Sequence, residues 1–226
     1  MSRVAVVTGA ARGIGAATVA ALRAAGFETV GIDREAGRGT LAADLADPAA
    51  IAAAFAGIAA RTGRIDALVN SAGIHVEQPL SEADPETLDR LLAVNIRAPI
   101  LVAKAALPLL APEARIVNVA SELAYLGRAG AAAYAATKGA MLALTRSWAR
   151  ELAPIRVNAV APGPTDTALL GFAAMSSAEQ ALETANPLGR IGRPEEIAAV
   201  IAFLCGEGAG FVTGQCFSAD GGAAMH

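Results

Sequence analysis

Three side chains with acid–base chemistry stand at a fixed spacing in the second half of the chain. Tyr134 follows Ser121 by thirteen positions, and Lys138 follows Tyr134 by four. On a helix, residues at i and i+4 share one face, so the Lys138 ammonium can lie near the Tyr134 phenol. At about 4 Å and an effective dielectric of about 20, their attraction is on the order of 4 kcal/mol. We therefore expect Lys138 to lower the pKa of Tyr134 from its ordinary value of about 10 and to make it a general acid and base.

Ser121 directly follows an apolar run, 115–119, that is typical of a buried strand. A hydroxyl at the end of a strand can hydrogen-bond a substrate oxygen and the alkoxide that develops on it. Moving a proton on or off a carbinol oxygen is one half of alcohol oxidation or ketone reduction. The other half is hydride transfer, which requires a redox cofactor.

A glycine-rich turn near the N-terminus offers a place for such a cofactor. The segment 8–15 reads Thr-Gly-Ala-Ala-Arg-Gly-Ile-Gly, follows the first apolar run and opens the first helical pattern. Glycine allows a tight turn and a close backbone approach, and the following helix directs its amides and positive dipole end at a phosphate. We predict a dinucleotide-binding turn here. The residues expected to contact the cofactor are Gly9, Arg12, Gly13, Ile14 and Gly15.

Asp33 ends the second predicted strand, twenty residues after Gly13. A carboxylate at this place accepts hydrogen bonds from the adenosine ribose hydroxyls and repels a 2′-phosphate. Asp33 therefore favours NAD over NADP. Arg12 and Arg34 keep the alternative open, because a guanidinium near this strand end can bind the extra phosphate of NADP.

Apolar runs rich in Val and Ile alternate with longer Ala- and Leu-rich stretches of helical periodicity, as in βαβ units. The predicted strands are 4–7, 29–32, 41–43, 67–69, 115–119, 156–160 and 211–217. The predicted helices are 13–25, 48–61, 85–110 with a break around Pro99, 131–152, 177–184 and 194–205. We predict an α/β fold: a Rossmann-like, doubly wound parallel sheet of about seven strands with helices on both faces.

Nothing in the sequence marks a domain boundary, so we predict one domain over residues 1–226. The irregular segment 162–193 holds seven Gly and Pro residues around one short helical stretch. Long connections of this kind in a compact domain are more often lids or binding loops than slack. We predict that 162–193 is a lid over the substrate, mobile without cofactor and ordered with it.

Composition argues against several other classes of protein. The net charge is -3 and the basic residues are scattered, which is not a nucleic-acid-binding pattern. No apolar stretch is expected to span a membrane, and no secretory signal precedes the first strand. Cys205 and Cys216 are expected to be buried thiols, and His75 and His226 lack metal-ligand spacing, so no metal is expected. These features favour a cytoplasmic protein.

With these residues in hand, the chain resembles the short-chain dehydrogenase/reductase family over nearly its whole length. Besides the turn at 8–15 and the Tyr-x-x-x-Lys motif, the matching segments are Asp44-Leu45, Asn70-Ser71-Ala72-Gly73, Asn95, Ser121, Pro162-Gly163 with Thr167, and Asp220-Gly221-Gly222. Each segment alone is a weak signal, but their order and spacing are specific to the family.

The resemblance implies roles for these residues. It implies catalysis by Asn95, Ser121, Tyr134 and Lys138, with Asn95 holding a water in the proton path and Lys138 also reaching the nicotinamide ribose. It implies further cofactor contacts from Asp44, Leu45, Asn70, Ala72, Gly73, Pro162, Gly163, Thr165 and Thr167. We also predict a homo-oligomer, a tetramer as in the family, with helices 85–110 and 131–152 at an interface because their alanine-rich outer faces leave apolar surface uncovered.

We therefore predict an NAD-dependent oxidoreductase that transfers a hydride between a secondary alcohol or ketone and the nicotinamide. The alternatives are an NADPH-dependent 3-oxoacyl carrier-protein reductase and a catalytically silent dinucleotide-binding regulator. The substrate pocket is expected to be lined by 122–130 and 164–189. It is predicted to be mainly apolar, with contributions from Leu123, Tyr125, Leu169, Leu170, Phe172 and Met175.

Overall fold

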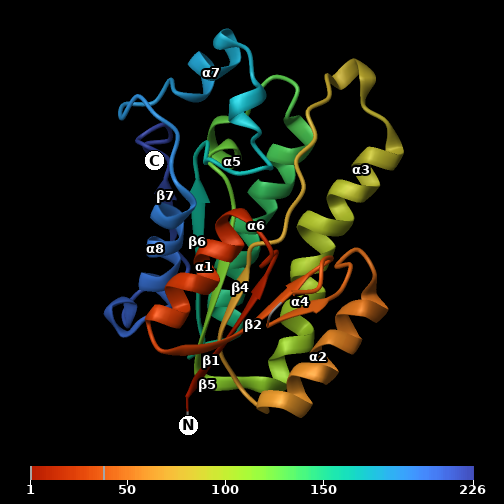
Figure 1. The fold of residues 1–226 in the computed structure, drawn as a ribbon, viewed down its shortest axis with the longest axis vertical. Helices are drawn as coiled ribbons and strands as arrows, with labels where there is room; N and C mark the ends of the chain where they lie inside the picture. The colour runs from red at the N-terminus through yellow and green to blue at the C-terminus, as the bar shows by residue number, and fades with distance from the viewer. Residues whose placement is uncertain (1, 38) are drawn as a thin grey trace.

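The computed structural model describes residues 2–37 and 39–226. Its centre is a parallel sheet of seven strands in the order β3-β2-β1-β4-β5-β6-β7 (Figure 1). The chain moves outward from β1 to β2 and β3, then crosses back to β4 and continues in the other direction. The predicted doubly wound sheet is confirmed. The strands are β1 (Arg3–Thr8), β2 (Phe27–Asp33), β3 (Thr40–Ala42), β4 (Ile65–Asn70), β5 (Leu110–Val119), β6 (Arg156–Pro162) and β7 (Cys216–Ala219).

Helices cover both faces of the sheet. One face carries α1 (Gly13–Ala24) and α8 (Pro194–Cys205), and the other carries α2 (Pro48–Thr62), α4 (Ala98–Ala106) and α6 (Ala132–Glu151). The remaining helices are α3 (Pro85–Leu92), α5 (Leu123–Leu126) and α7 (Ser177–Glu183), with short 3-10 turns at Leu80–Glu82, Leu107–Leu109, Phe172–Ala174 and Glu207–Ala209.

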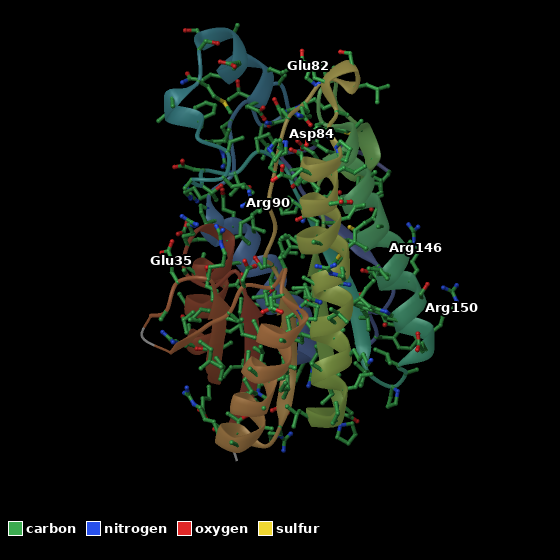
Figure 2. All side chains as sticks on the ribbon, turned by 90° about the vertical axis from the view of Figure 1, so that its right-hand side faces the viewer. Glu35, Glu82, Asp84, Arg90, Arg146 and Arg150 are labelled. Carbon is green, nitrogen blue, oxygen red and sulfur yellow. The ribbon has the colours of Figure 1, made fainter. Side chains whose placement is uncertain are left out.

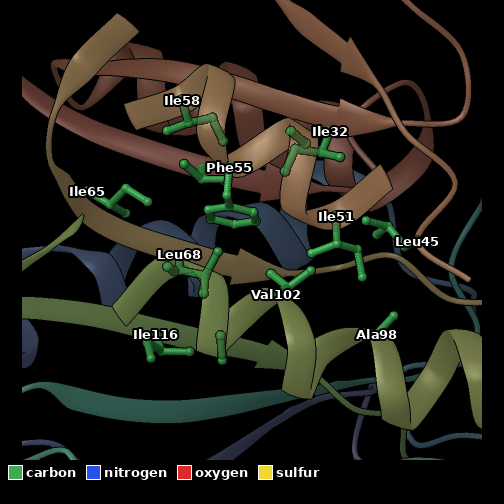
Figure 3. Packing of buried hydrophobic residues seen from close by; sticks show 14 of the residues in the cluster. Ile32, Leu45, Ile51, Phe55, Ile58, Ile65, Leu68, Ala98, Val102 and Ile116 are labelled. Atoms are coloured by element: carbon green, nitrogen blue, oxygen red, sulfur yellow. The ribbon is translucent and has the colours of Figure 1, made fainter. Parts of the chain in front are cut away.

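The strands are unbroken apolar runs because both of their faces are buried. In β1, Val6 faces the core cluster beneath α2 and α4, whereas Ala5 and Val7 face the cluster beneath α1 and α8. Figure 3 shows the first cluster, in which Phe55 of α2 packs against strand and α4 side chains. The only tryptophan, Trp148 of α6, is 9% exposed and belongs to this same cluster.

The long helical region after β4 departs from its prediction. Its irregularity lies at Ala93–Arg97, a π-helical turn between α3 and α4, and not at Pro99, which sits in the first turn of α4. Taken together, Pro85–Leu109 form one helical stretch whose length and mean hydropathy of 1.5 would suffice to cross a membrane, contrary to the sequence-based expectation. Here the stretch packs against β4, α2 and α6, which accounts for its apolar face.

The last strand is shorter than predicted and begins later. Residues 211–217 were expected to be extended, but β7 starts at Cys216, and Phe211 is fully exposed. Gly214 has a φ of +71° and its amide donates to the Val157 carbonyl at 2.7 Å, while the Val157 amide donates to Thr213 Oγ1 at 3.0 Å. These bonds turn the chain across the start of β6 before pairing begins.

Candidate active site

A cavity of about 470 Å³ lies at the carboxyl ends of the strands. It opens where the strand order reverses between β1 and β4, the place where open parallel sheets bind ligands. All the predicted cofactor and catalytic residues line it except Asn70 and Asn95. The predicted residues in its wall are Gly9, Arg12, Gly13, Ile14, Gly15, Asp33, Asp44, Leu45, Ala72, Gly73, Ser121, Tyr134, Lys138, Pro162, Gly163, Thr165 and Thr167.

The glycine turn is shaped for close backbone approach. A Cβ on Gly15 would lie 1.9 Å from the Gly9 carbonyl oxygen, and a Cβ on Gly9 would lie 2.9 Å from Ala72 Cα. Arg12 is the N-cap of α1 and makes no side-chain cap, and the first turn holds no acidic residue. The first amides of α1 and its positive dipole end are therefore available to an anion. This cradle fits the pyrophosphate of a dinucleotide.

Side-chain hydrogen bonds of Thr8 and Asn70 connect the strands and loops next to the cavity. The Thr8 hydroxyl accepts from the amides of Ser71 and Ala72, both at 3.1 Å, and so joins the glycine turn to the loop after β4. Asn70 is buried and donates to Asn118 Oδ1 at 2.9 Å. Its side chain bonds β4 to β5, and Asn70 is not among the residues that line the cavity, so its predicted contact with the cofactor stays a prediction.

Asp33 lies at the cavity edge and is already engaged by the backbone. Its Oδ2 accepts from the Ala11 amide at 2.9 Å, and its Oδ1 accepts from the Arg34 amide at 2.7 Å. Each carboxylate oxygen retains a second lone pair for a ribose hydroxyl. Arg12 lies 3.9 Å from the Glu35 carboxylate, so a second acidic group stands in this neighbourhood.

Ser121, Tyr134 and Lys138 meet in the same cavity, and all three are buried. Ser121 follows the end of β5, and its Oγ accepts from the Leu123 amide at 3.2 Å. Lys138 donates from Nζ to the Val119 carbonyl at 2.9 Å and lies 5.7 Å from the centre of the Tyr134 ring. Tyr134 and Lys138 therefore lie on one face of α6, as predicted.

The electrostatics of the pair differ from the expectation. Burial raises the pKa of Tyr134 to about 12, although a hydrogen bond with Ser121 acts in the opposite direction. Burial also lowers the pKa of Lys138 to about 8. The predicted lowering of the Tyr134 pKa by Lys138 is therefore not present in this structure, because burial of the two groups acts against their charged forms.

Asn95 has its side chain occupied by protein partners. Its Oδ1 accepts from the Ile74 amide at 2.9 Å, and its Nδ2 donates to the Ile74 carbonyl at 2.9 Å and to Thr137 Oγ1 at 3.1 Å. Asn95 thus connects the loop after β4 to the helix that carries Tyr134. Its side chain positions these elements, and the role of Asn95 in holding a water stays a prediction.

The substrate end of the cavity is more polar than predicted. Leu123, Leu169 and Leu170 line it as expected, but Tyr125, Phe172 and Met175 do not. Instead, the wall includes charged and polar residues that were not predicted to be functional: His75, Arg90, Glu122, Arg128 and Glu183. Arg90 projects from α3 toward the cavity (Figure 2). No motif spacing links these residues, because the fold brings them together from four separate segments.

An ion pair joins the predicted lid to the body of the protein. Arg128 donates to Glu183 of α7 through two bonds, Nη1 to Oε1 at 2.5 Å and Nη2 to Oε2 at 3.1 Å. The Glu183 side chain is only 6% exposed. A buried carboxylate that loses its cation carries a large desolvation penalty, so this pair fixes the position of α7.

We expect the substitution Arg128→Met to loosen the lid. Glu183 would remain buried without its partner, and amide hydrogen exchange across residues 172–185 should become at least tenfold faster. Arg190→Met is the matched control, because Arg190 pairs with Glu196 on the exposed side of the same region. Equal exchange in wild type and Arg128→Met would show that the ion pair does not hold α7.

The described residues contain no group of three or more His, Cys, Asp and Glu side chains that could hold a metal ion. Cys205 is buried, Cys216 is half-buried, and both are free thiols.

Comparison with known proteins agrees with this site. A family model described as enoyl-(acyl carrier protein) reductase matches residues 9–224. The cis-4-hydroxycyclohexanecarboxylate dehydrogenase of Sinomonas cyclohexanicum is 40% identical over 240 residues, covering 97% of this chain and 96% of that protein. The chain belongs to the short-chain dehydrogenase/reductase family. Oxidoreductases of this family bind a nicotinamide dinucleotide, which fits the cradle at Gly9 and Gly15.

Two solved structures of the family contain cofactor. A blue fluorescent protein from a metagenomic library, in complex with NADPH, has a TM-score of 0.91 and 34% identity and covers 99% of this chain and 98% of its own. A 3-ketoacyl-(acyl-carrier-protein) reductase from Brucella melitensis, complexed with NADH, has a TM-score of 0.90 and 33% identity with the same coverage. Similar short-chain dehydrogenase/reductase folds thus accept either cofactor.

Proposed function

We propose that this protein is an NAD-dependent oxidoreductase that transfers a hydride between a secondary alcohol or its ketone and the nicotinamide. The observation that carries the proposal is the convergence of Ser121, Tyr134 and Lys138 on the cavity that also contains the glycine cradle. Proton-transfer groups alone, or a dinucleotide site alone, would be compatible with many functions. Coupled transfer of a hydride and a proton requires both features in one cavity.

A nicotinamide dinucleotide held by the glycine turn at Gly9, Gly13 and Gly15 would supply the hydride acceptor for oxidation of the carbinol carbon. Ser121 Oγ hydrogen-bonds the substrate oxygen and orients it toward Tyr134. Tyr134 would accept the hydroxyl proton as its phenolate during oxidation, and as the neutral phenol it would donate a proton to the carbonyl oxygen during reduction. Lys138, anchored on the Val119 carbonyl, supplies positive charge beside this oxygen when protonated. Burial of all three groups excludes water and strengthens each of these interactions.

The proposal is tested with a panel of secondary alcohols and ketones, followed by NADH absorbance and repeated with NADP. Turnover of any alcohol or ketone supports an enzyme and excludes the silent regulator. Exclusive turnover of 3-oxoacyl thioesters with NADPH would instead favour the carrier-protein reductase. The similar carrier-protein reductase from Brucella melitensis is complexed with NADH. A preference of this protein for NAD, as expected from Asp33, would therefore not by itself exclude the carrier-protein reductase.

We also propose a homo-oligomer, most simply a tetramer. Exposed leucine and isoleucine side chains gather along the outer face of α3 and α4, where Leu88, Leu92 and Ile100 are each about two-fifths exposed. An apolar stripe of this kind on a charged surface marks an interface. On α6, Arg146 and Arg150 project outward near the C-terminal end of the helix, so the proposed interface on this helix would be bordered by positive charge (Figure 2).

Light scattering at micromolar concentration should give a mass above that of the 22.6 kDa chain. Leu92→Glu should shift the protein toward monomer, because it places a charge in the apolar stripe. Leu169→Glu provides a control on an exposed leucine of the lid. A monomeric mass for the wild type would contradict the proposal.

We also propose a cytoplasmic location. The free thiols of Cys205 and Cys216 are compatible with a reducing compartment.

A further inference from the structure

Two residues of the cavity wall each carry a buried polar atom that has no hydrogen-bond partner within the protein. Six such side-chain atoms occur among the described residues, and only His75 Nε2 and Glu122 Oε2 belong to residues that line the cavity. Buried polar groups in folded proteins are almost always paired, and an unpaired one costs free energy. We therefore treat these two atoms, which belong to residues lining one ligand cavity, as candidate partners for a polar group of a ligand.

Both atoms lie beside the reacting centre. The His75 ring, in the loop after β4, packs on the Tyr134 ring with a centroid separation of 4.4 Å. Glu122 directly follows Ser121 and is 5% exposed, and its amide donates to the Pro162 carbonyl at 3.0 Å. A Cβ on Gly163 would lie 2.8 Å from Glu122 Oε2, so the carboxyl packs over a glycine that leaves room for it.

The charged side chains around His75 and Glu122 either bond to other residues or lie beyond hydrogen-bond distance of the two unpaired atoms. The Arg128 guanidinium is held by Glu183 and lies 3.7 Å from Glu77. Glu77 Oε1 is also 3.7 Å from His75 Nε2, which is beyond hydrogen-bond distance. Asp220, which also acts on Glu122, accepts from two backbone amides of the segment 222–224. The hydrogen-bonding capacity of both unpaired atoms is therefore open to a ligand.

The protonation states follow from burial and from these neighbours. Burial, together with the charges of Asp220 and Glu183, raises the pKa of Glu122 to about 7, with Arg128 acting in the opposite direction. Burial lowers the pKa of His75, with Arg128 and Lys138 acting in the same direction and Glu77 and Glu183 opposing. A pKa of about 7 leaves Glu122 as a mixture of the protonated and ionised forms at neutral pH, and burial favours the neutral form of His75. A hydroxyl both donates and accepts, so it can pair with either form of the Glu122 carboxyl and with neutral His75.

We propose that His75 and Glu122 are specificity-determining residues that bind hydroxyl groups next to the reacting carbinol, so that the substrate is a vicinal diol or cyclic polyol. The inference rests on the proposed function and refines its substrate class. A site built to bond a hydroxyl rejects an analogue that lacks it, because the polar groups of the site then stay unpaired.

The test compares kcat/KM for 1,2-cyclohexanediol with kcat/KM for cyclohexanol, which differ by one hydroxyl. We expect the wild type to prefer the diol at least tenfold. Glu122→Leu and His75→Leu should each reduce that ratio at least fivefold, whereas Glu122→Gln, which keeps polar atoms at this place, should retain most of it. Ser218→Ala is the matched control, because Ser218 Oγ is also buried and unpaired but lies outside the cavity wall.

Thermal unfolding separates recognition from a structural role. Removing an unpaired buried carboxyl should leave the melting temperature of ligand-free Glu122→Leu at or above that of the wild type. A clear decrease would mean that the protein itself uses this carboxyl, and it would overturn the inference.

Equal or better turnover of cyclohexanol would also overturn it while leaving the proposed oxidoreductase function intact. Preference for 2-aminocyclohexanol over the diol would overturn it by assigning Glu122 the role of a counter-ion. Absence of turnover of all three alcohols and of the wider panel, with either cofactor, would contradict the proposed function itself.

Discussion

Replacing Tyr134 with phenylalanine should lower kcat at least a thousandfold while leaving dinucleotide affinity within about threefold of the wild type. The substitution removes one hydroxyl and keeps the ring, which packs against His75 and in a small cluster with Leu91 and Leu123. Ser121 and Lys138 retain their bonds to the protein backbone, so the cavity keeps its shape. A thousandfold loss corresponds to about 4 kcal/mol of barrier, a reasonable cost for losing the group that transfers the proton.

Stopped-flow or steady-state turnover with a preferred alcohol measures the effect on kcat, and titration of NADH binding measures affinity. Tyr125→Phe is the matched control, because Tyr125 is the only other tyrosine and does not line the cavity. It should keep kcat within about threefold. Activity of Tyr134→Phe within tenfold of the wild type would show that another group transfers the proton.

Replacing Asp33 with alanine or serine should shift the ratio of kcat/KM for NAD over NADP by at least tenfold toward NADP. The carboxylate offers acceptors for the ribose hydroxyls and would repel a 2′-phosphate in a partly desolvated place where salt screens poorly. Its loss would also remove the repulsion that opposes binding of that phosphate by Arg12 and Arg34. A tenfold shift is about 1.4 kcal/mol.

Asp33 also holds the Ala11 amide, so an Asp33→Asn variant is needed to separate charge from support of the glycine turn. The amide oxygen can still accept from Ala11, and only the charge is lost. Glu28→Ala is the control, since Glu28 lies at the opposite end of β2 and pairs with Arg61. Wild-type enzyme that already uses both cofactors equally, or variants with an unchanged ratio, would contradict the role given to Asp33.

Features that depend on local sequence could be predicted. The alternation of apolar runs and helical stretches follows from burial of strands on both faces, and it predicted the doubly wound sheet and its number of strands. The glycine positions were predictable because their geometry permits no other residue, as Gly15 illustrates. The spacing of Ser121, Tyr134 and Lys138 likewise places them on a strand end and one helix face.

Features set by the tertiary environment were not predictable. The pKa of Tyr134 depends on how deeply α6 packs, which no i, i+4 spacing reveals. The polar substrate end depends on loops that meet only in the folded protein: Arg128 and Glu183 are 55 residues apart in sequence. The start of β7 was also missed, because the turn at Gly214 is fixed by bonds to Val157 on a distant strand.

The burial of Trp148 gives the protein a spectroscopic reporter of its own. As the only indole in the chain, it packs in the core cluster beneath α2 and α4, whereas both tyrosines lie on α5 and α6 near the cavity end. Its native fluorescence should be blue-shifted and should move to longer wavelength when this core opens. Because none of the proposed substitutions lies in that cluster, one emission spectrum can establish for each variant whether a loss of turnover reflects chemistry or unfolding.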